Sequence, residues 1–350
     1  MFADTKALKI PEGDVVKVEW NGVVLWELQT SKPVVLEVAK VTSNTYAGET
    51  LYENEEFILL DIYPKTNGTV NVTYGGLTKT ITDTSGAESP NAQQVYFGTF
   101  NGVSDSVATP ASGELVIEGE YENFGCGTYQ LTEKTISKGY ASCITTVTDC
   151  GDIKEIVSYA FYGNTNLTTI QLPEGITSIG SNAFYGCTNL TLNSLPNSVT
   201  HIGDYAFKEC FNVNIRQLPS NLVSIGDSAF LMSEGLPKDG ATTAFSILAM
   251  YGATIILPET IQSIGDDAYR TAYSEMDTET MYSSYISEIV ILATTPPTIS
   301  KDTFGNYFAN KIVTGNVLSQ IKVTVPAGCG DAYRNADVWK SNTDNIVEAS

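Results

Sequence analysis

The chain has 350 residues, 42% of them hydrophobic, and a formal net charge of -21 at pH 7. Nucleic acids and anionic lipid surfaces bind to cationic faces, so this charge argues against both as partners. No run of 18 apolar residues occurs, and a membrane-spanning helix is therefore not expected.

Residues 1–30 are predicted to form a short β-hairpin. Asn21-Gly22 lies between two runs rich in Val and Trp, and an Asn-Gly pair in that setting is the strongest short hairpin signal. Residues 9–27 also loosely resemble lead-in segments of phage and prophage structural proteins, and this resemblance implies a docking segment. Residues 1–10 have no apolar stretch behind a basic start, so no secretory signal is visible.

Residues 31–121 have the pattern of a β-sandwich. Branched and aromatic residues are bounded by turn residues, which predicts strands at 34–36, 57–60, 70–74, 78–81, 95–97 and 115–117. Gly75-Gly76 joins two alternating arms and predicts a hairpin. Short strands at this spacing favour two packed sheets. The pattern is similar to a bacterial immunoglobulin-like (Ig-like) module, although the Cys…Trp…Cys core of such domains is absent.

The rest of the chain is organised by a period of 23 residues. Ala-Phe pairs recur at 160–161, 183–184, 206–207 and 229–230, and Leu-Pro and Ile-Gly pairs recur with the same step. A fixed period in the twenties with apolar residues locked to it indicates a solenoid of stacked coils. We expect a junction and solenoid cap at 122–150, a β-rich solenoid with short helical or irregular insertions at 151–322, and a C-terminal cap at 323–350.

The period assigns structural roles to several side chains. Those that share a slot in successive coils are expected to stack, with apolar ones inward and Asn bonding turn backbone. The predicted ladder consists of Phe161, Phe184, Phe207, Phe230, Asn166, Asn189, Asn212, Cys187 and Cys210. The glycines of the Ile-Gly pairs are expected at corners with positive φ; they are Gly180, Gly203, Gly226 and Gly265.

Cysteine and histidine offer no metal site and no catalytic pair. Cys126, Cys143 and Cys150 cluster before the repeats and are the better disulfide candidates, with no pairing deducible. His201 is the only histidine and takes a slot that holds serine in other coils, so it is interpreted as a repeat variant rather than a base. No phosphate-binding loop or dinucleotide fingerprint occurs. The sequence predicts no catalytic residue, no metal and no cofactor.

The repeat carries a family resemblance. Residues 166–190, NLTTIQLPEGITSIGSNAFYGCTNL, closely resemble the BspA-like leucine-rich repeat, and the likeness extends from about residue 144 to a cap-like segment at 323–339. The resemblance implies a right-handed solenoid of microbial surface proteins that bind host proteins or each other. Asn193 and Arg216 depart from the pattern, and Leu192 and Ile215 take the apolar role one step earlier, which predicts a shifted or bulged strand register there.

All length variation falls in one arm of the coil, the arm after the aromatic residue, and it begins after Phe230. Three successive insertions should therefore gather on one edge of the solenoid, and such an edge is often a binding face. The alternative is that the insertions only pack on the solenoid flank. The candidate binding residues, chosen because Tyr, Met and Phe suit recognition, are Phe245, Met250, Tyr251, Tyr273, Met281, Tyr282, Tyr285, Tyr307 and Phe308.

These features favour a non-enzymatic adhesion protein at the cell surface or outside the cell. Its solenoid would recognise a protein or glycan on a host or bacterial surface. One alternative is a phage or prophage virion protein that attaches to a host and contacts the particle through residues 1–121. A second alternative is a glycan-processing enzyme with an acidic pair in a cleft of the sandwich.

Overall fold

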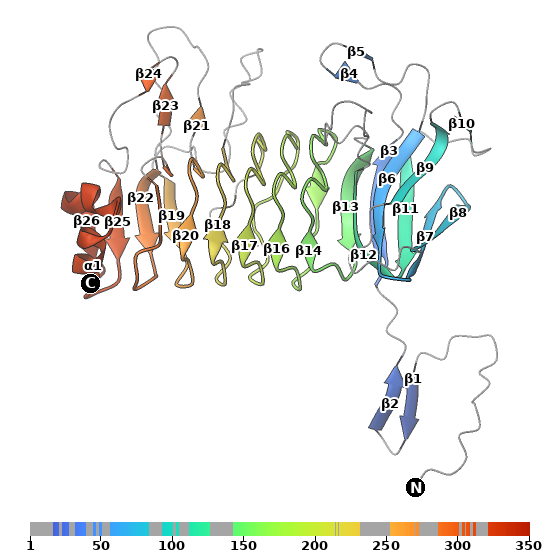
Figure 1. Cartoon of the computed structure of the whole chain (residues 1–350), viewed down its shortest axis with the longest axis horizontal. Coiled ribbons are helices and arrows are strands. Elements are labelled where there is room, and N and C mark those ends of the chain that lie inside the picture. Colours follow the sequence, from blue (N-terminus) through green and yellow to red (C-terminus); the bar gives the residue numbers. More distant parts are fainter. Residues whose placement is uncertain are drawn as a thin grey trace.

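A computed structural model describes residues 17–20, 23–27, 32–39, 45–46, 49–50, 57–83, 93–100, 103–104, 112–126, 143–213, 215, 217–231, 253–269, 271–272, 286–300, 303–304, 306–308, 311–312 and 321–350. Strands dominate these residues, and the coils of the solenoid follow one another in a single row beside the N-terminal sheets (Figure 1). Within the same residues, no helix is long and apolar enough to cross a membrane.

Two antiparallel hairpins confirm the turn predictions. Strands β1 (Lys17–Trp20) and β2 (Val23–Glu27) pair across Asn21-Gly22, with Trp20 opposite Val23. Strands β7 (Thr69–Tyr74) and β8 (Leu77–Thr82) pair across Gly75-Gly76, and both glycines have positive φ, as a primed two-residue turn requires. A further short pair joins β4 (Thr45–Tyr46) to β5 (Glu49–Thr50).

The predicted strands between residues 34 and 117 are all present and lie in two sheets. One sheet has the order β10-β9-β6-β12, and the other has the order β15-β13-β3-β11-β7-β8. Tyr74 and Phe97 meet edge to face at 5.7 Å and so join the two sheets through their inner faces. The Ig-like assignment stays a prediction. The remaining strands are β3 (Val34–Ala39), β6 (Phe57–Pro64), β9 (Gln93–Phe100), β10 (Val103–Ser104), β11 (Ser112–Gly119), β12 (Tyr121–Cys126), β13 (Ile144–Cys150) and β15 (Thr169–Ile170).

Strand β13 belongs to both the N-terminal sheet and the repeats. Along one edge it pairs antiparallel with β3, and along the other it pairs parallel with β15 of the first regular coil. Hydrogen bonds therefore run without a break from the N-terminal sheet into the solenoid (Figure 1). The strand edge that the first coil would otherwise expose to solvent is therefore covered by β13.

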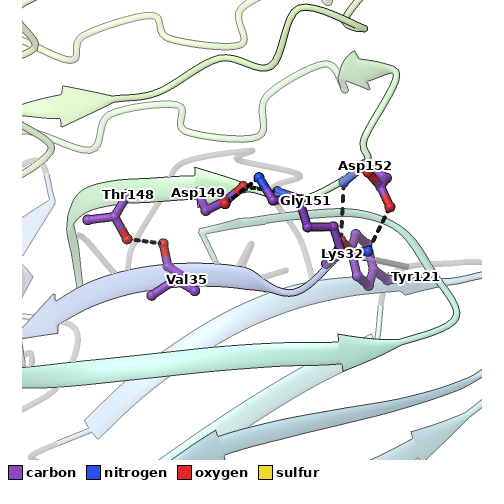
Figure 2. A network of polar contacts seen from close by, with 7 residues as sticks. All are labelled: Lys32, Val35, Tyr121, Thr148, Asp149, Gly151 and Asp152. Atoms are coloured by element: carbon purple, nitrogen blue, oxygen red, sulfur yellow. Dashed lines mark hydrogen bonds and ion pairs between the residues drawn. The ribbon is translucent and has the colours of Figure 1, made fainter. Parts of the chain in front are cut away.

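A polar network fastens the turn after β13 to the start of β3 (Figure 2). The Lys32 ammonium pairs with the Asp149 carboxylate at 2.5 Å, and the Lys32 backbone N–H donates to Asp152 Oδ2 at 2.6 Å. Tyr121 Oη donates to the Lys32 carbonyl and accepts from the Asp152 N–H. Gly151 has a φ of 63° and lies against Tyr121 and Lys32, so a side chain at this position would collide with the network.

The solenoid has two parallel sheets. The first, in the order β14-β16-β17-β18-β20, takes one short strand from each coil, and the second, in the order β19-β22-β25-β26, takes longer strands from the later coils. Leu192 bridges Val213 rather than Ile215, which lies one period on, so the register between these two coils is offset by two residues. Their strands are β14 (Glu155–Ile156), β16 (Ser178–Ile179), β17 (His201–Ile202), β18 (Ser224–Ile225), β20 (Ser263–Ile264), β19 (Ala253–Leu257), β22 (Ile286–Ile291), β25 (Lys322–Val325) and β26 (Ile346–Glu348).

A continuous stack of aromatic rings forms the core of the solenoid. Neighbouring rings lie nearly parallel with centroids 5.2–5.7 Å apart, and each is buried. The edge of Phe124 from β12 closes one end of the stack at 6.0 Å, and Trp339 closes the other at 6.5 Å. Trp339 begins the 3-10 helix η2 (Trp339–Asn345), which follows helix α1 (Gly330–Asn335). The stacked rings are Phe161, Phe184, Phe207, Phe230, Tyr269 and Phe304.

Glycine is required in the Ile-Gly pairs for a different physical reason from the one predicted. Positive φ does not occur at Gly180, Gly203, Gly226 or Gly265; it occurs two residues later, at Asn182, Tyr205, Ser228 and Asp267. A Cβ built on each of these glycines would lie 2.5–2.6 Å from a backbone nitrogen of the preceding coil. The expectation of positive φ at the glycines is therefore wrong, and glycine is required because adjacent backbones approach closely.

The described cysteines are free thiols in the core or partly covered. Cys187 Sγ donates to the Phe161 carbonyl at 3.0 Å, and Cys210 Sγ donates to the Phe184 carbonyl at 2.9 Å. Cys143 directly precedes β13, Cys150 is its last residue, and both are free, so the prediction of a disulfide through either is wrong. Burial raises the pKa of both thiols to about 12, which leaves them protonated and unreactive. The Cys126 side chain lies outside the described residues.

Candidate functional site

The residues predicted for the insertion edge are largely outside the described part of the chain. Tyr307 and Phe308 lie in strand β23 (Asn306–Phe308), where only the backbone is described. That strand pairs with β21 (Thr271–Ala272) of the preceding insertion and with β24 (Lys311–Ile312), so neighbouring insertions are hydrogen-bonded to each other (Figure 1). Residues outside the description are Phe245, Met250, Tyr251, Tyr273, Met281, Tyr282 and Tyr285.

The predicted asparagine ladder joins turns of adjacent coils. Asn189 Nδ2 donates to the Thr165 carbonyl at 2.7 Å, and Asn212 Nδ2 donates to the Thr188 carbonyl at 3.1 Å. The Asn166 N–H donates to Asn164 Oδ1 at 3.2 Å within its own turn. The side-chain amides of Asn189 and Asn212 are thus engaged by backbone carbonyls of the preceding coil.

An open groove of about 680 Å³ crosses the first parallel sheet of the solenoid and was not predicted. Its floor is formed by the Ile-Gly pairs of four coils and by Ile299 of the next, and the isoleucines are buried. On one side of these pairs lies a row formed by His201 and hydroxyls, and on the other side lies a row of hydroxyls and carboxylates. The first row is His201, Ser224, Ser263 and Thr298; the second row is Ser158, Ser181, Asp204, Asp227 and Asp266.

The stacking of the coils holds two of the carboxylates in place. The Asp227 N–H donates to Asp204 Oδ1, and the Asp266 N–H donates to Asp227 Oδ1, each at 2.8 Å. One carboxylate oxygen thus completes the backbone bonding of the next coil, while all three side chains remain exposed. The groove therefore presents exposed carboxylates on three successive coils, and those of Asp204 and Asp227 are held by hydrogen bonds from the next coil.

His201 lies in the hydroxyl row and is exposed. Its Nδ1 lies 2.7 Å from the Thr200 hydroxyl, whereas a Ser-His-Asp arrangement requires a carboxylate on that nitrogen. Among the described residues, no group of three or more His, Cys, Asp or Glu side chains could hold a metal ion. The arrangement suits hydrogen bonding along the groove rather than acid–base chemistry.

A second surface, which we call the tyrosine cluster, consists of Tyr159, Tyr162, Tyr185, Tyr205 and Lys208. The rings of Tyr162 and Tyr185 stack at 4.8 Å, and Tyr159 lies 5.7 Å from Tyr162. The Lys208 ammonium lies 5.0 Å from the Tyr185 ring and 5.4 Å from the Tyr205 ring. The only sequence signal for this cluster is that tyrosine recurs at two slots beside the buried Ala-Phe pair.

Comparison with known proteins identifies the repeats. The family model described as the BspA type leucine rich repeat region matches residues 137–238 in six copies. This stretch is a BspA-type leucine-rich repeat region. The coils after residue 238 lie beyond the match, although the parallel sheets continue through them. No curated protein matches the chain.

Two solved structures are similar to parts of the chain. One is a leucine-rich repeat protein of T. pallidum, with 25% identity over 35% of this chain and a TM-score of 0.26. The chain spans about half of that protein, 52% of its length. The other is a leucine-rich cell surface protein of Faecalibacterium prausnitzii, with 14% identity, a TM-score of 0.23, and coverage of 56% of this chain and 76% of that one.

Proposed function

We propose that this chain is a non-enzymatic recognition protein that works at a cell surface and holds an extended segment of a partner protein along the groove. The observation that carries the proposal is the groove itself, which crosses successive coils and has polar side chains on both sides in the coils of Asp204, Asp227 and Asp266. The BspA-type repeats support a recognition role, because solenoids of stacked coils commonly present extended binding surfaces.

The partner segment is proposed to be cationic. Asp204, Asp227 and Asp266 place an exposed carboxylate on each of three neighbouring coils, and the whole chain carries -21 charges. Complementary charge accelerates encounter and fixes register more than it adds affinity. Each exposed ion pair contributes roughly 0.2–1 kcal/mol, so three of them together provide about a tenfold preference over a neutral segment.

The direct test measures binding of a synthetic Lys-Ser repeat peptide to the full chain by calorimetry. Replacing all three groove aspartates with asparagine keeps an acceptor oxygen for the inter-coil N–H groups and removes the charges. We expect about a tenfold loss of affinity and a weaker dependence on salt. The matched control neutralises three exposed glutamates elsewhere, Glu114, Glu118 and Glu259. Equal losses in the two triple variants would reject the groove.

The insertion edge remains part of the proposal as a second contact. Trimming residues 231–254 and 270–288 to the length of a regular arm should reduce attachment to cells that carry the partner and leave the Lys-Ser peptide affinity unchanged. A folded trimmed chain that attaches as well as the full chain would remove the edge from the binding surface. Detection of the native protein in purified phage particles rather than in the cell-wall fraction would replace the cell-surface setting with a virion.

A further inference from the structure

Tyr159 and Tyr205 hold a backbone conformation that tyrosine rarely adopts. Their φ angles are 65° and 56°, in the left-handed region where a bulky side chain is disfavoured. The coil between them has Asn182 at the same slot with φ 59°, and later coils have Ser228 and Asp267 there. The fold therefore requires a left-handed residue at this slot but does not require tyrosine.

The same two tyrosines are exposed rather than committed to the core. Tyr159 is 37% exposed and Tyr205 is 38% exposed. Glu209 is a parallel case, because it has φ 61° in a slot that Gly163 and Gly186 fill in earlier coils, and its carboxylate accepts the Tyr185 hydroxyl at 2.8 Å. An exposed residue whose type is disfavoured in the left-handed conformation, at a slot where asparagine or glycine would fit, is a sign of a ligand-binding role.

Polar groups lie between the rings of the cluster. Lys208 lies over two of them, Glu209 holds the hydroxyl of a third, and Asn182 occupies the slot between Tyr159 and Tyr205. The centre of a protein–protein interface is depleted of charged residues, so this mixture does not favour a protein ligand. Aromatic faces surrounded by hydrogen-bonding groups suit a pyranose ring, whose C–H face stacks on the aromatic while its hydroxyls bond outward.

We propose that the tyrosine cluster binds a linear, neutral oligosaccharide. The net charge of -21 disfavours anionic glycans. Tyr159 and Tyr205 share a slot two coils apart, so their backbones are separated by about 10 Å at the usual strand spacing. A glycan that lies along the solenoid axis can place separate sugar units on the two rings and a polar unit over Asn182. This inference does not rest on the groove.

The cluster also borders the insertion edge. Tyr162, Tyr185 and Lys208 share a slot, and the next residue of that slot is Leu231, from which the first insertion departs. The Glu209 N–H donates to the Leu231 carbonyl at 3.1 Å, which fixes the cluster against that point of departure. The oligosaccharide site is therefore placed beside the edge that carries all the length variation of the repeats.

The experiment titrates the full chain with chitohexaose, cellohexaose and mannohexaose by calorimetry. The double variant Tyr159→Asn/Tyr205→Asn reproduces the residue already present at the intermediate coil, so it should fold and melt at the wild-type temperature or above. We expect wild type to bind at least one hexasaccharide and the double variant to bind it at least tenfold more weakly, with roughly a fivefold loss for each ring.

The controls separate this site from other surfaces. Leu292→Asn/Val347→Asn removes two exposed apolar side chains outside the cluster and should leave oligosaccharide binding unchanged. The double variant Asp227→Asn/Asp266→Asn alters the groove alone and should also leave oligosaccharide binding unchanged. The proposal is overturned if wild type binds none of the three hexasaccharides, or if the folded double variant binds as well as wild type. Tyrosine-dependent binding of the Lys-Ser peptide without any sugar binding would assign the cluster to a protein instead.

Discussion

Replacing Tyr269 with phenylalanine should stabilise the protein. Tyr269 occupies a slot of the aromatic stack that holds phenylalanine in the neighbouring coils, with its ring 5.3 Å from Phe230 and 5.7 Å from Phe304. Its hydroxyl is buried and has no hydrogen-bond partner among the residues that the structure describes. A buried polar group left unpaired costs about 1–3 kcal/mol, whereas both stacking contacts survive removal of the hydroxyl. We therefore expect Tyr269→Phe to raise the free energy of unfolding by about 1 kcal/mol.

Urea denaturation followed by far-ultraviolet circular dichroism measures this change. The midpoint should rise with an unchanged slope, because the surface exposed on unfolding is nearly the same. The pH dependence of the free energy of unfolding provides a second test of the same reasoning. Burial raises the pKa of Tyr269 above its ordinary value, so above about pH 10 the unfolded chain ionises this hydroxyl and the folded chain does not. Wild type should then lose stability relative to the variant by about 1.4 kcal/mol per pH unit.

The reasoning fails if Tyr269→Phe lowers the midpoint, because the hydroxyl would then have a partner that contributes to stability. It also fails if the stability difference between the two proteins is the same at pH 8 and pH 11. The other tyrosines with raised pKa values, such as Tyr185 and Tyr333, are common to both proteins. Their ionisation cancels in the comparison, and only the residue at position 269 differs.

Three other substitutions test the packing. Phe207→Ala removes a ring stacked at 5.3 Å on Phe184 and should cost about 3–5 kcal/mol in a urea melt; a loss below ~1 kcal/mol would reject the inward assignment. Gly203→Ala places a Cβ 2.6 Å from the Ser181 nitrogen and should lower the free energy of unfolding by about 1–3 kcal/mol. The control substitution Ser224→Ala should lower it by less than ~0.5 kcal/mol. Gly151→Ala should break the network of Figure 2 and speed amide exchange in β13, whereas unchanged protection there would show that the network does not hold that strand.

Much of the fold could be predicted because the sequence repeats wherever the environment repeats. Each coil must bury one ring and one isoleucine against the next coil, so Phe184 and Ile179 recur at the period and mark the core without further information. The hairpins at Asn21-Gly22 and Gly75-Gly76 were predictable for a different reason, since a turn depends on only a few adjacent residues. In both cases, the determining interactions are periodic or local.

The misassigned glycines show where that reasoning ends. Gly203 recurs with the same fidelity as Phe207, but recurrence alone does not distinguish a left-handed backbone from a close approach between coils. The left-handed slot was missed because it holds Tyr159, Asn182, Tyr205, Ser228 and Asp267 in turn, so no single residue type marks it in successive coils. A slot that varies in sequence while its φ stays fixed becomes visible only when the backbone is known.

The two candidate binding surfaces were missed for a related reason. A groove depends on which side chains face each other across two neighbouring rows, and Asp204 and His201 belong to different rows of the same coil. Stacking constrains the inward residues of every coil equally, and it leaves outward residues free to differ. Departures from the repeat at outward slots, such as tyrosine where asparagine suffices, are therefore a better guide to recognition in a solenoid than the repeat itself. That argument predicts function at Tyr159 and Tyr205 before it predicts function at any residue of the ladder.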